Sequence, residues 1–129
     1  MKEFDLLSIY PSINKRYVSK NTRKIENRII ASYRDKEFYD GKRDNGYGGF
    51  KYDGRWKKIA ERIFEHYKLK ENARILQIGS DKGFLLNDIK NIKPKCTVAG
   101  IEVSNYAIKK TLKSVKKYIK KSSFVNLPY

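Results

Sequence analysis

The chain has 129 residues, of which 40% are hydrophobic and 34% are charged, and its net charge is +16. This length suits one domain with a core of its own, and the aromatic content of 13% excludes a disordered tail. No apolar run approaches the roughly 20 residues that cross a bilayer, and the first residues lack a signal-peptide pattern. The single cysteine, Cys96, excludes an internal disulfide and a cysteine-rich metal site. We therefore expect a soluble, cytoplasmic protein without a metal ion.

The strong positive charge has two explanations. Clustered lysines and arginines bind nucleic acids, because they neutralise phosphates and release counterions. Here the basic residues are mostly lysines spread along the whole chain, and arginine, which binds phosphate in a more specific geometry, is in the minority. The distribution favours compositional bias, and nucleic-acid binding stays an alternative.

The N-terminal part is predicted to be an extension, residues 1–37. Residues 1–20 show no steady periodicity and include Pro11, which indicates an arm or a short helix. A helix then follows, with Asn21 or Thr22 as its cap. Its apolar positions are Ile25, Ile29, Ile30 and Tyr33.

Residues 38–56 are rich in glycine and in aromatic side chains, which indicates an ordered loop. Its aromatic rings either cover a ligand or anchor the loop on the core; anchoring is favoured for Tyr47 and Phe50, and Tyr52 fits both roles equally. An amphipathic helix follows, and His66 lies beside its apolar stripe, where we expect a surface residue. The stripe consists of Trp56, Ile59, Ala60, Ile63, Phe64 and Tyr67.

Strands and helices alternate in the rest of the chain. We predict a buried strand over 74–78, a helix from residue 84, a β-branched strand over 97–103 and a helix capped by Ser104. One more short strand is predicted within 122–129. The helix after Ser104 would face inward with Ile108, Leu112, Val115 and Ile119. The alternation predicts an α/β fold with an incomplete, Rossmann-like parallel sheet of about three strands and flanking helices.

The first strand ends in the turn Gly79-Ser80-Asp81-Lys82-Gly83, which opens a helix. Glycines allow a tight exit from the strand and a close approach of the helix, whose free N–H groups favour anions. Glu102 ends the next strand, where a carboxylate can accept the hydroxyls of a ribose. The carboxyl ends of parallel strands meet at one edge, so we expect the turn and Glu102 to converge. The alternative is that the glycines only shape the backbone and that Glu102 is solvated.

The segments "ILQIGSDKGFLL" and "GIEVS" resemble the first and second motifs of class I S-adenosylmethionine-dependent methyltransferases. The resemblance covers residues 38–129 and implies a partial Rossmann-like domain that binds S-adenosylmethionine. Two positions depart from the family pattern: Gln77 replaces the usual acid, and Asp81 replaces the middle glycine. The implied cofactor-binding residues are Gly79, Ser80, Asp81 and Gly83 for methionine and ribose, Glu102 for the ribose hydroxyls, Val103 beside adenine, and, less directly, Gln77 and Tyr52.

The tail "NLPY", residues 126–129, resembles a motif of methyltransferases that modify bases in RNA. In that family the motif follows the fourth strand, whereas here it follows the third, so we expect a small-molecule methyl acceptor instead. The family sheet continues beyond the first strand, so the chain is expected to be the cofactor-binding part only. Its exposed strand edge would permit self-association. We nominate no catalytic residue, and a non-catalytic interaction module remains a further alternative.

Overall fold

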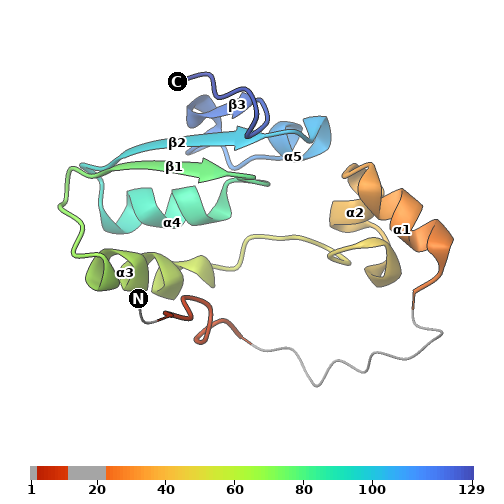
Figure 1. Cartoon of the computed structure of the whole chain (residues 1–129), viewed down its shortest axis with the longest axis horizontal. Coiled ribbons are helices and arrows are strands. Elements are labelled where there is room, and N and C mark those ends of the chain that lie inside the picture. The colour runs from red at the N-terminus through yellow and green to blue at the C-terminus, as the bar shows by residue number, and fades with distance from the viewer. Residues whose placement is uncertain (1–2, 12–22) are drawn as a thin grey trace.

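The structure is a computed structural model that describes residues 3–11 and 23–129 (Figure 1). The helices and strands in chain order are α1 (Ile25–Ser32), α2 (Lys36–Asp40), the 3-10 turn η1 (Arg43–Asn45), α3 (Trp56–His66), β1 (Arg74–Ile78), α4 (Phe84–Ile92), β2 (Thr97–Glu102), α5 (Asn105–Lys109), the 3-10 turn η2 (Lys116–Tyr118) and β3 (Ile119–Lys121). Among these described residues, no helix has the length and hydropathy to cross a membrane.

The three strands form one parallel sheet in the order β1-β2-β3. Ile75 of β1 pairs with Val98 of β2, and Gly100 of β2 pairs with Ile119 of β3. Helix α4 lies along the sheet and α3 packs against α4 (Figure 1). The predicted α/β, Rossmann-like parallel sheet is confirmed, and the sheet is not closed. The buried core is formed by Ala60, Phe64, Leu86, Ile89, Cys96, Val98, Val115 and Ile119.

The predicted strand over 74–78 is present, but the prediction that it is buried is wrong. Side chains alternate along a strand, so Ile75 faces the core while Leu76 and Ile78 face the opposite side. There Leu76 is 40% exposed and Ile78 is 55% exposed. The described part of the chain therefore covers only one face of β1.

The C-terminal part also differs from its prediction. The helix after Ser104 ends at Lys109, Ile119 belongs to β3, and the expected strand within 122–129 is not formed. The cause is tertiary, because the N–H of Leu112 donates to the carbonyl of Lys82 at 3.1 Å instead of continuing the helix. The expected inward residues still pack on the core, and Val115 is fully buried there.

The described residues of the N-terminal extension contact the rest of the chain through α3 and through Arg34. Residues 3–11 lie along α3, where Phe4 stacks on His66 with ring centroids 3.5 Å apart. Helix α1 begins after Lys24, and the cap candidates Asn21 and Thr22 lie outside the described residues. Helix α2 spans 36–40 and so crosses the expected boundary at residue 37.

Gly83 provides a test of the packing between the turn and the C-terminal segment. Its φ is +78°, and a Cβ there would lie 2.9 Å from Cγ2 of Val115 and 3.0 Å from Cδ1 of Ile119. Gly54 has a similar φ of +76°, but a Cβ there would meet nothing within 4 Å. We expect Gly83→Ala to lower the free energy of unfolding by about 2–4 kcal/mol, because it adds overpacking to backbone strain. Gly54→Ala should cost about 1 kcal/mol, from the strain alone.

Urea denaturation of the two variants measures this difference. Equal losses of stability would contradict the packing of Gly83 against Val115 and Ile119.

Candidate functional site

The turn after β1 and the acid at the end of β2 lie in direct contact. The N–H groups of Gly79 and Ser80 both donate to the carbonyl of Ile101, at 3.0 and 2.9 Å. The N–H of Asp81 then donates to Oε2 of Glu102 at 2.8 Å. The expected convergence of the glycine turn with Glu102 is therefore present in the structure.

The Glu102 carboxylate is a buried acceptor of backbone hydrogen bonds. Its Oε1 accepts the N–H groups of Val103 and Ser104, both at 2.9 Å, in addition to the bond from Asp81 to Oε2. The residue is 1% exposed, so the alternative of a solvated glutamate is wrong. A carboxylate has about four acceptor positions. Three are filled here, and one on Oε2 remains.

The backbone of the turn explains its residue types. Gly79 has a φ of +71°, Gly83 of +78°, and Asp81 of +48°. Aspartate is one of the few residues that adopt a left-handed conformation readily, which accounts for its place in the turn. A Cβ on Gly79 would meet nothing within 4 Å in the described part of the chain, which leaves open space beside this residue.

The side chain of Asp81 binds the N-terminal extension. Its Oδ1 accepts a hydrogen bond from the Tyr39 hydroxyl at 2.8 Å and from Nη2 of Arg34 at 3.0 Å. The carbonyl of Arg34 also accepts a hydrogen bond from the Ser104 hydroxyl. Burial raises the pKa of Asp81, and the hydrogen bond from Tyr39 opposes that shift. The segment between α1 and α2 therefore covers both the turn and the end of β2.

The neighbouring residue, Lys82, carries the opposite charge and binds the end of α2 and the aromatic loop that follows it. It is 5% exposed, and its Nζ lies 2.7 and 2.8 Å from the two carboxylate oxygens of Asp40. The same Nζ donates to the carbonyl of Phe50, and the Tyr106 hydroxyl donates to Asp40. Burial acts to raise the pKa of Asp40, but the hydrogen bonds from Lys82 and Tyr106 outweigh it and lower that pKa.

Sequence reasoning missed the residues that bind Asp81 and Lys82. Arg34 and Tyr39 reach Asp81 across 47 and 42 positions of sequence. No local pattern marks a partner at such a distance. The only signal was the aromatic character of the loop that begins at residue 38, which indicated order but not contact with the turn.

Two of the expected binding residues have buried polar atoms that find no hydrogen-bond partner among the described residues. These atoms are Oε1 of Gln77 and Oγ of Ser80, and Oδ2 of Asp88 on α4 is a third. A buried polar group without a partner costs about 1–3 kcal/mol. Such groups at a predicted binding turn are consistent with a ligand that supplies the missing partners.

The aromatic loop is anchored to α4. Tyr47 stacks on Phe50, and Phe50 stacks on Phe84, with centroids 4.4 and 4.7 Å apart. The Tyr52 hydroxyl donates to Oδ1 of Asp88, and this hydrogen bond raises the pKa of Tyr52. Tyr47 and Phe50 therefore anchor the loop on the core, and Tyr52 contacts α4 through Asp88. Val103, expected beside adenine, is 51% exposed next to Glu102.

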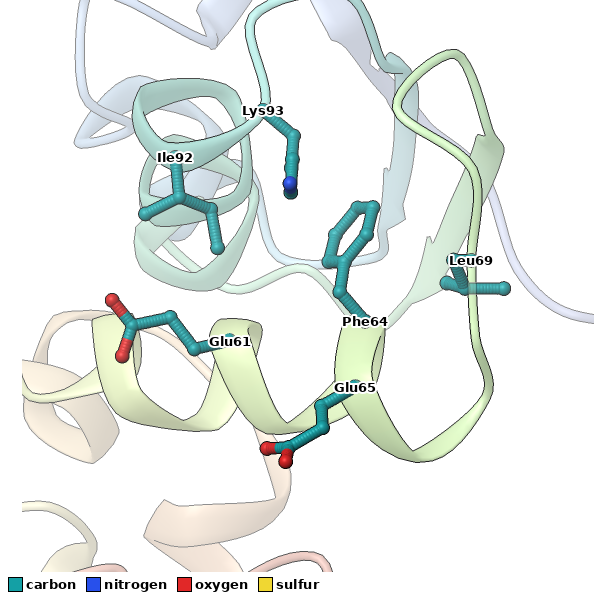
Figure 2. Close-up of a pocket in the computed structure, with 6 residues that line it drawn as sticks. All are labelled: Glu61, Phe64, Glu65, Leu69, Ile92 and Lys93. Carbon is teal, nitrogen blue, oxygen red and sulfur yellow. The ribbon is translucent and has the colours of Figure 1, made fainter.

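A separate pocket of about 480 Å³ lies between α3 and the end of α4 (Figure 2). In Figure 2 Phe64 and Ile92 lie on its inner side, and Lys93 points toward the gap between them. The carboxylates of Glu61 and Glu65 come from α3 and lie on its outer side. None of its lining residues was expected to bind the cofactor, and it is not part of the candidate site.

Comparison of the sequence with models of protein families and with curated proteins gave no match. The chemistry of the site therefore rests on its geometry.

The contact between Asp40 and Lys82 predicts a pH-dependent stability. Because the fold lowers the pKa of Asp40, its contribution is present above the unfolded pKa of about 4 and is lost as the pH falls through the lower, folded pKa. We expect Asp40→Asn to lower the free energy of unfolding by about 1–2 kcal/mol at pH 7. This difference from the wild type should shrink below pH 4, where the carboxyl becomes neutral.

Urea denaturation between pH 3 and 7 measures both effects, and Asp44→Asn on the exposed turn η1 is the matched control. For Asp81, whose pKa is raised by burial, the sign is reversed: its contribution is greatest at low pH and is lost as the pH rises. A pH-independent loss in Asp40→Asn would show that the ion pair does not stabilise the fold.

Proposed function

We propose that the chain binds S-adenosylmethionine and is the cofactor-binding part of a methyltransferase. The observation that carries the proposal is the 2.8 Å contact between the Asp81 amide and the Glu102 carboxylate. It brings a glycine turn and a carboxylate, which can accept hydrogen bonds from ribose hydroxyls, to the carboxyl edge of a parallel sheet. Ligands of open α/β sheets bind at that edge.

The residues of the turn supply complementary groups for such a cofactor. Open space beside Gly79 leaves room for the ligand, and the unpartnered oxygens of Ser80 and Gln77 are acceptors for a donor such as its ammonium group. The remaining acceptor position on Glu102 would take a ribose hydroxyl. The exposed Val103 offers apolar surface to the adenine ring.

Binding requires that the segment at Arg34 moves, because Glu102 is only 1% exposed. The contacts to be opened include the hydrogen bond from the Ser104 hydroxyl to the Arg34 carbonyl and the ion pair of Arg34 with Asp81, whose side chains are 39% and 20% exposed. An ion pair of this exposure is worth about 1 kcal/mol or less. Tyr39 is fully buried, so the smallest opening moves the Arg34 turn and leaves α2 in place.

The proposed acceptor is a small molecule. The proposal assigns no general base, because methyl transfer depends mainly on alignment of the acceptor with the sulfonium. The cofactor supplies the electrophilic methyl group, and the residues named above hold and orient it.

Gly79 gives the sharpest test of the cofactor site. Gly79→Ala places a methyl group in the space that the ligand would occupy, whereas Gly54→Ala adds the same methyl group at a similar φ outside the turn. We expect calorimetry to show at least a tenfold weaker affinity for S-adenosylhomocysteine in Gly79→Ala. The affinity of Gly54→Ala should stay within twofold of the wild type.

Glu102→Gln is a less specific probe, because it also disturbs three backbone hydrogen bonds. Absence of binding by the wild type, or equal affinities of the two glycine variants, would overturn the proposal.

Arg34 gives a second test, on the covering segment. Arg34→Ala removes the ion pair that must open, so we expect S-adenosylhomocysteine to bind about threefold to fivefold more tightly. Arg28→Ala, on the exposed side of α1, removes the same charge and should leave the affinity unchanged. Stopped-flow binding should also show faster association for Arg34→Ala. Weaker binding by this variant would identify Arg34 as a ligand contact and not as a cover.

A further inference from the structure

An open groove of about 510 Å³ lies on the sheet at the end opposite the 79–83 turn. It is formed by the first halves of β1 and β2, together with η2, β3 and the last residue of the chain. Its lining residues are Arg74, Ile75, Leu76, Thr97, Val98, Ala99, Lys117, Tyr118, Lys120 and Tyr129.

The floor of the groove is apolar and incompletely covered. Leu76 is 40% exposed and Ala99, its partner across the strands, is half-buried. Tyr129 at the side of the groove is 60% exposed. The strands of parallel sheets are normally covered on both faces, usually by helices. Apolar area left in water costs about 25 cal/mol per Å², so a covering element would be stabilised.

The rim of the groove carries positive charge. Arg74, Lys117 and Lys120 surround the apolar floor, and none of the lining residues is acidic. Lys117 and Lys120 lie over the rings of Tyr118 and Tyr129, at 5.0 and 4.7 Å, so both charges stay beside the groove. A complementary occupant is apolar on one side and acidic at its flanks.

We propose that this groove binds an acidic amphipathic helix of a partner protein. A helix suits the open face of a parallel sheet, where its apolar stripe would cover Leu76 and its flanking carboxylates would meet Arg74 and Lys120. The charge argues against a second copy of this chain, because two molecules of net charge +16 would face each other with the same basic rim. Single-stranded nucleic acid binds through its phosphates and by stacking its bases on aromatic rings, whereas the floor of this groove, Leu76 and Ala99, is aliphatic and so favours the helix.

The test uses a fluorescein-labelled, 18-residue peptide with leucines on one helical face and glutamates at its flanks. A second peptide has the same composition in an order that removes the apolar stripe. Fluorescence anisotropy should give a micromolar Kd for the first peptide and at least tenfold weaker binding for the second. Equal binding of both peptides, or no binding of the first, would overturn the proposal.

Variants locate the peptide. Leu76→Ser removes exposed apolar surface and Arg74→Glu reverses a rim charge, and each should weaken binding at least tenfold. Lys57→Glu on the exposed side of α3 makes the same charge change away from the groove and should have less than a twofold effect. Equal losses in Arg74→Glu and Lys57→Glu would show binding through net charge alone and overturn the proposal.

Two further measurements distinguish other occupants. A 20-nucleotide single-stranded RNA that displaces the peptide, and binds Leu76→Ser as tightly as the wild type, would assign the surface to nucleic acid. Sedimentation that shows a wild-type dimer, converted to a monomer by Leu76→Ser, would assign it to a second copy. Either result would overturn the proposal. The proposal is supported if the wild type is a monomer and the RNA does not displace the peptide.

Discussion

The buried carboxylate of Glu102 is the contact on which the arrangement of the site depends. It accepts backbone N–H groups from both sides, from Asp81 in the turn after β1 and from Val103 and Ser104 at the start of α5. Hydrogen bonds to a charged acceptor are stronger than neutral ones. The Glu102 carboxylate is 1% exposed, so these three hydrogen bonds replace the hydration that it loses on burial. The acid therefore fixes the turn, the end of β2 and the next helix as one unit.

From this unit, two adjacent residues of opposite charge fix the end of the N-terminal extension, helix α2 and the aromatic loop. Asp81 accepts hydrogen bonds from Arg34 and Tyr39, and Lys82 binds Asp40 and the carbonyl of Phe50. The extension is thus part of the site and not an independent arm. The contacts that order the turn also cover Glu102, the acid that would hold a ribose, so they must open before a ligand can bind there.

The sheet has two distinct ends and two distinct faces. Its carboxyl end carries the turn and Glu102, while the groove over Leu76 lies at the amino end and on the face away from α4. The core faces α4, where Val98 and Ile119 are buried. A ligand at one end and a partner at the other would therefore bind without competing for the same residues.

The sequence by itself determined the features that depend on neighbouring residues. Helical spacing predicted α3, β-branched residues predicted β2, and the position of Glu102 at the end of that strand predicted its meeting with the turn. The position of Gly83 between a strand and a helix likewise predicted the start of α4. These signals are local, because periodicity and turn chemistry act within a few residues.

Only the tertiary structure decided the rest. The bond from Leu112 to the carbonyl of Lys82 ended a helix that the apolar spacing would have continued to Ile119. The burial of Glu102 and the position of Arg34 above it depend on residues far apart in the chain. The exposure of Leu76 likewise depends on the tertiary structure, because no described element packs on that face of β1. Contacts between residues so far apart produce no periodic pattern in the sequence, because they depend on how whole helices and strands pack against one another.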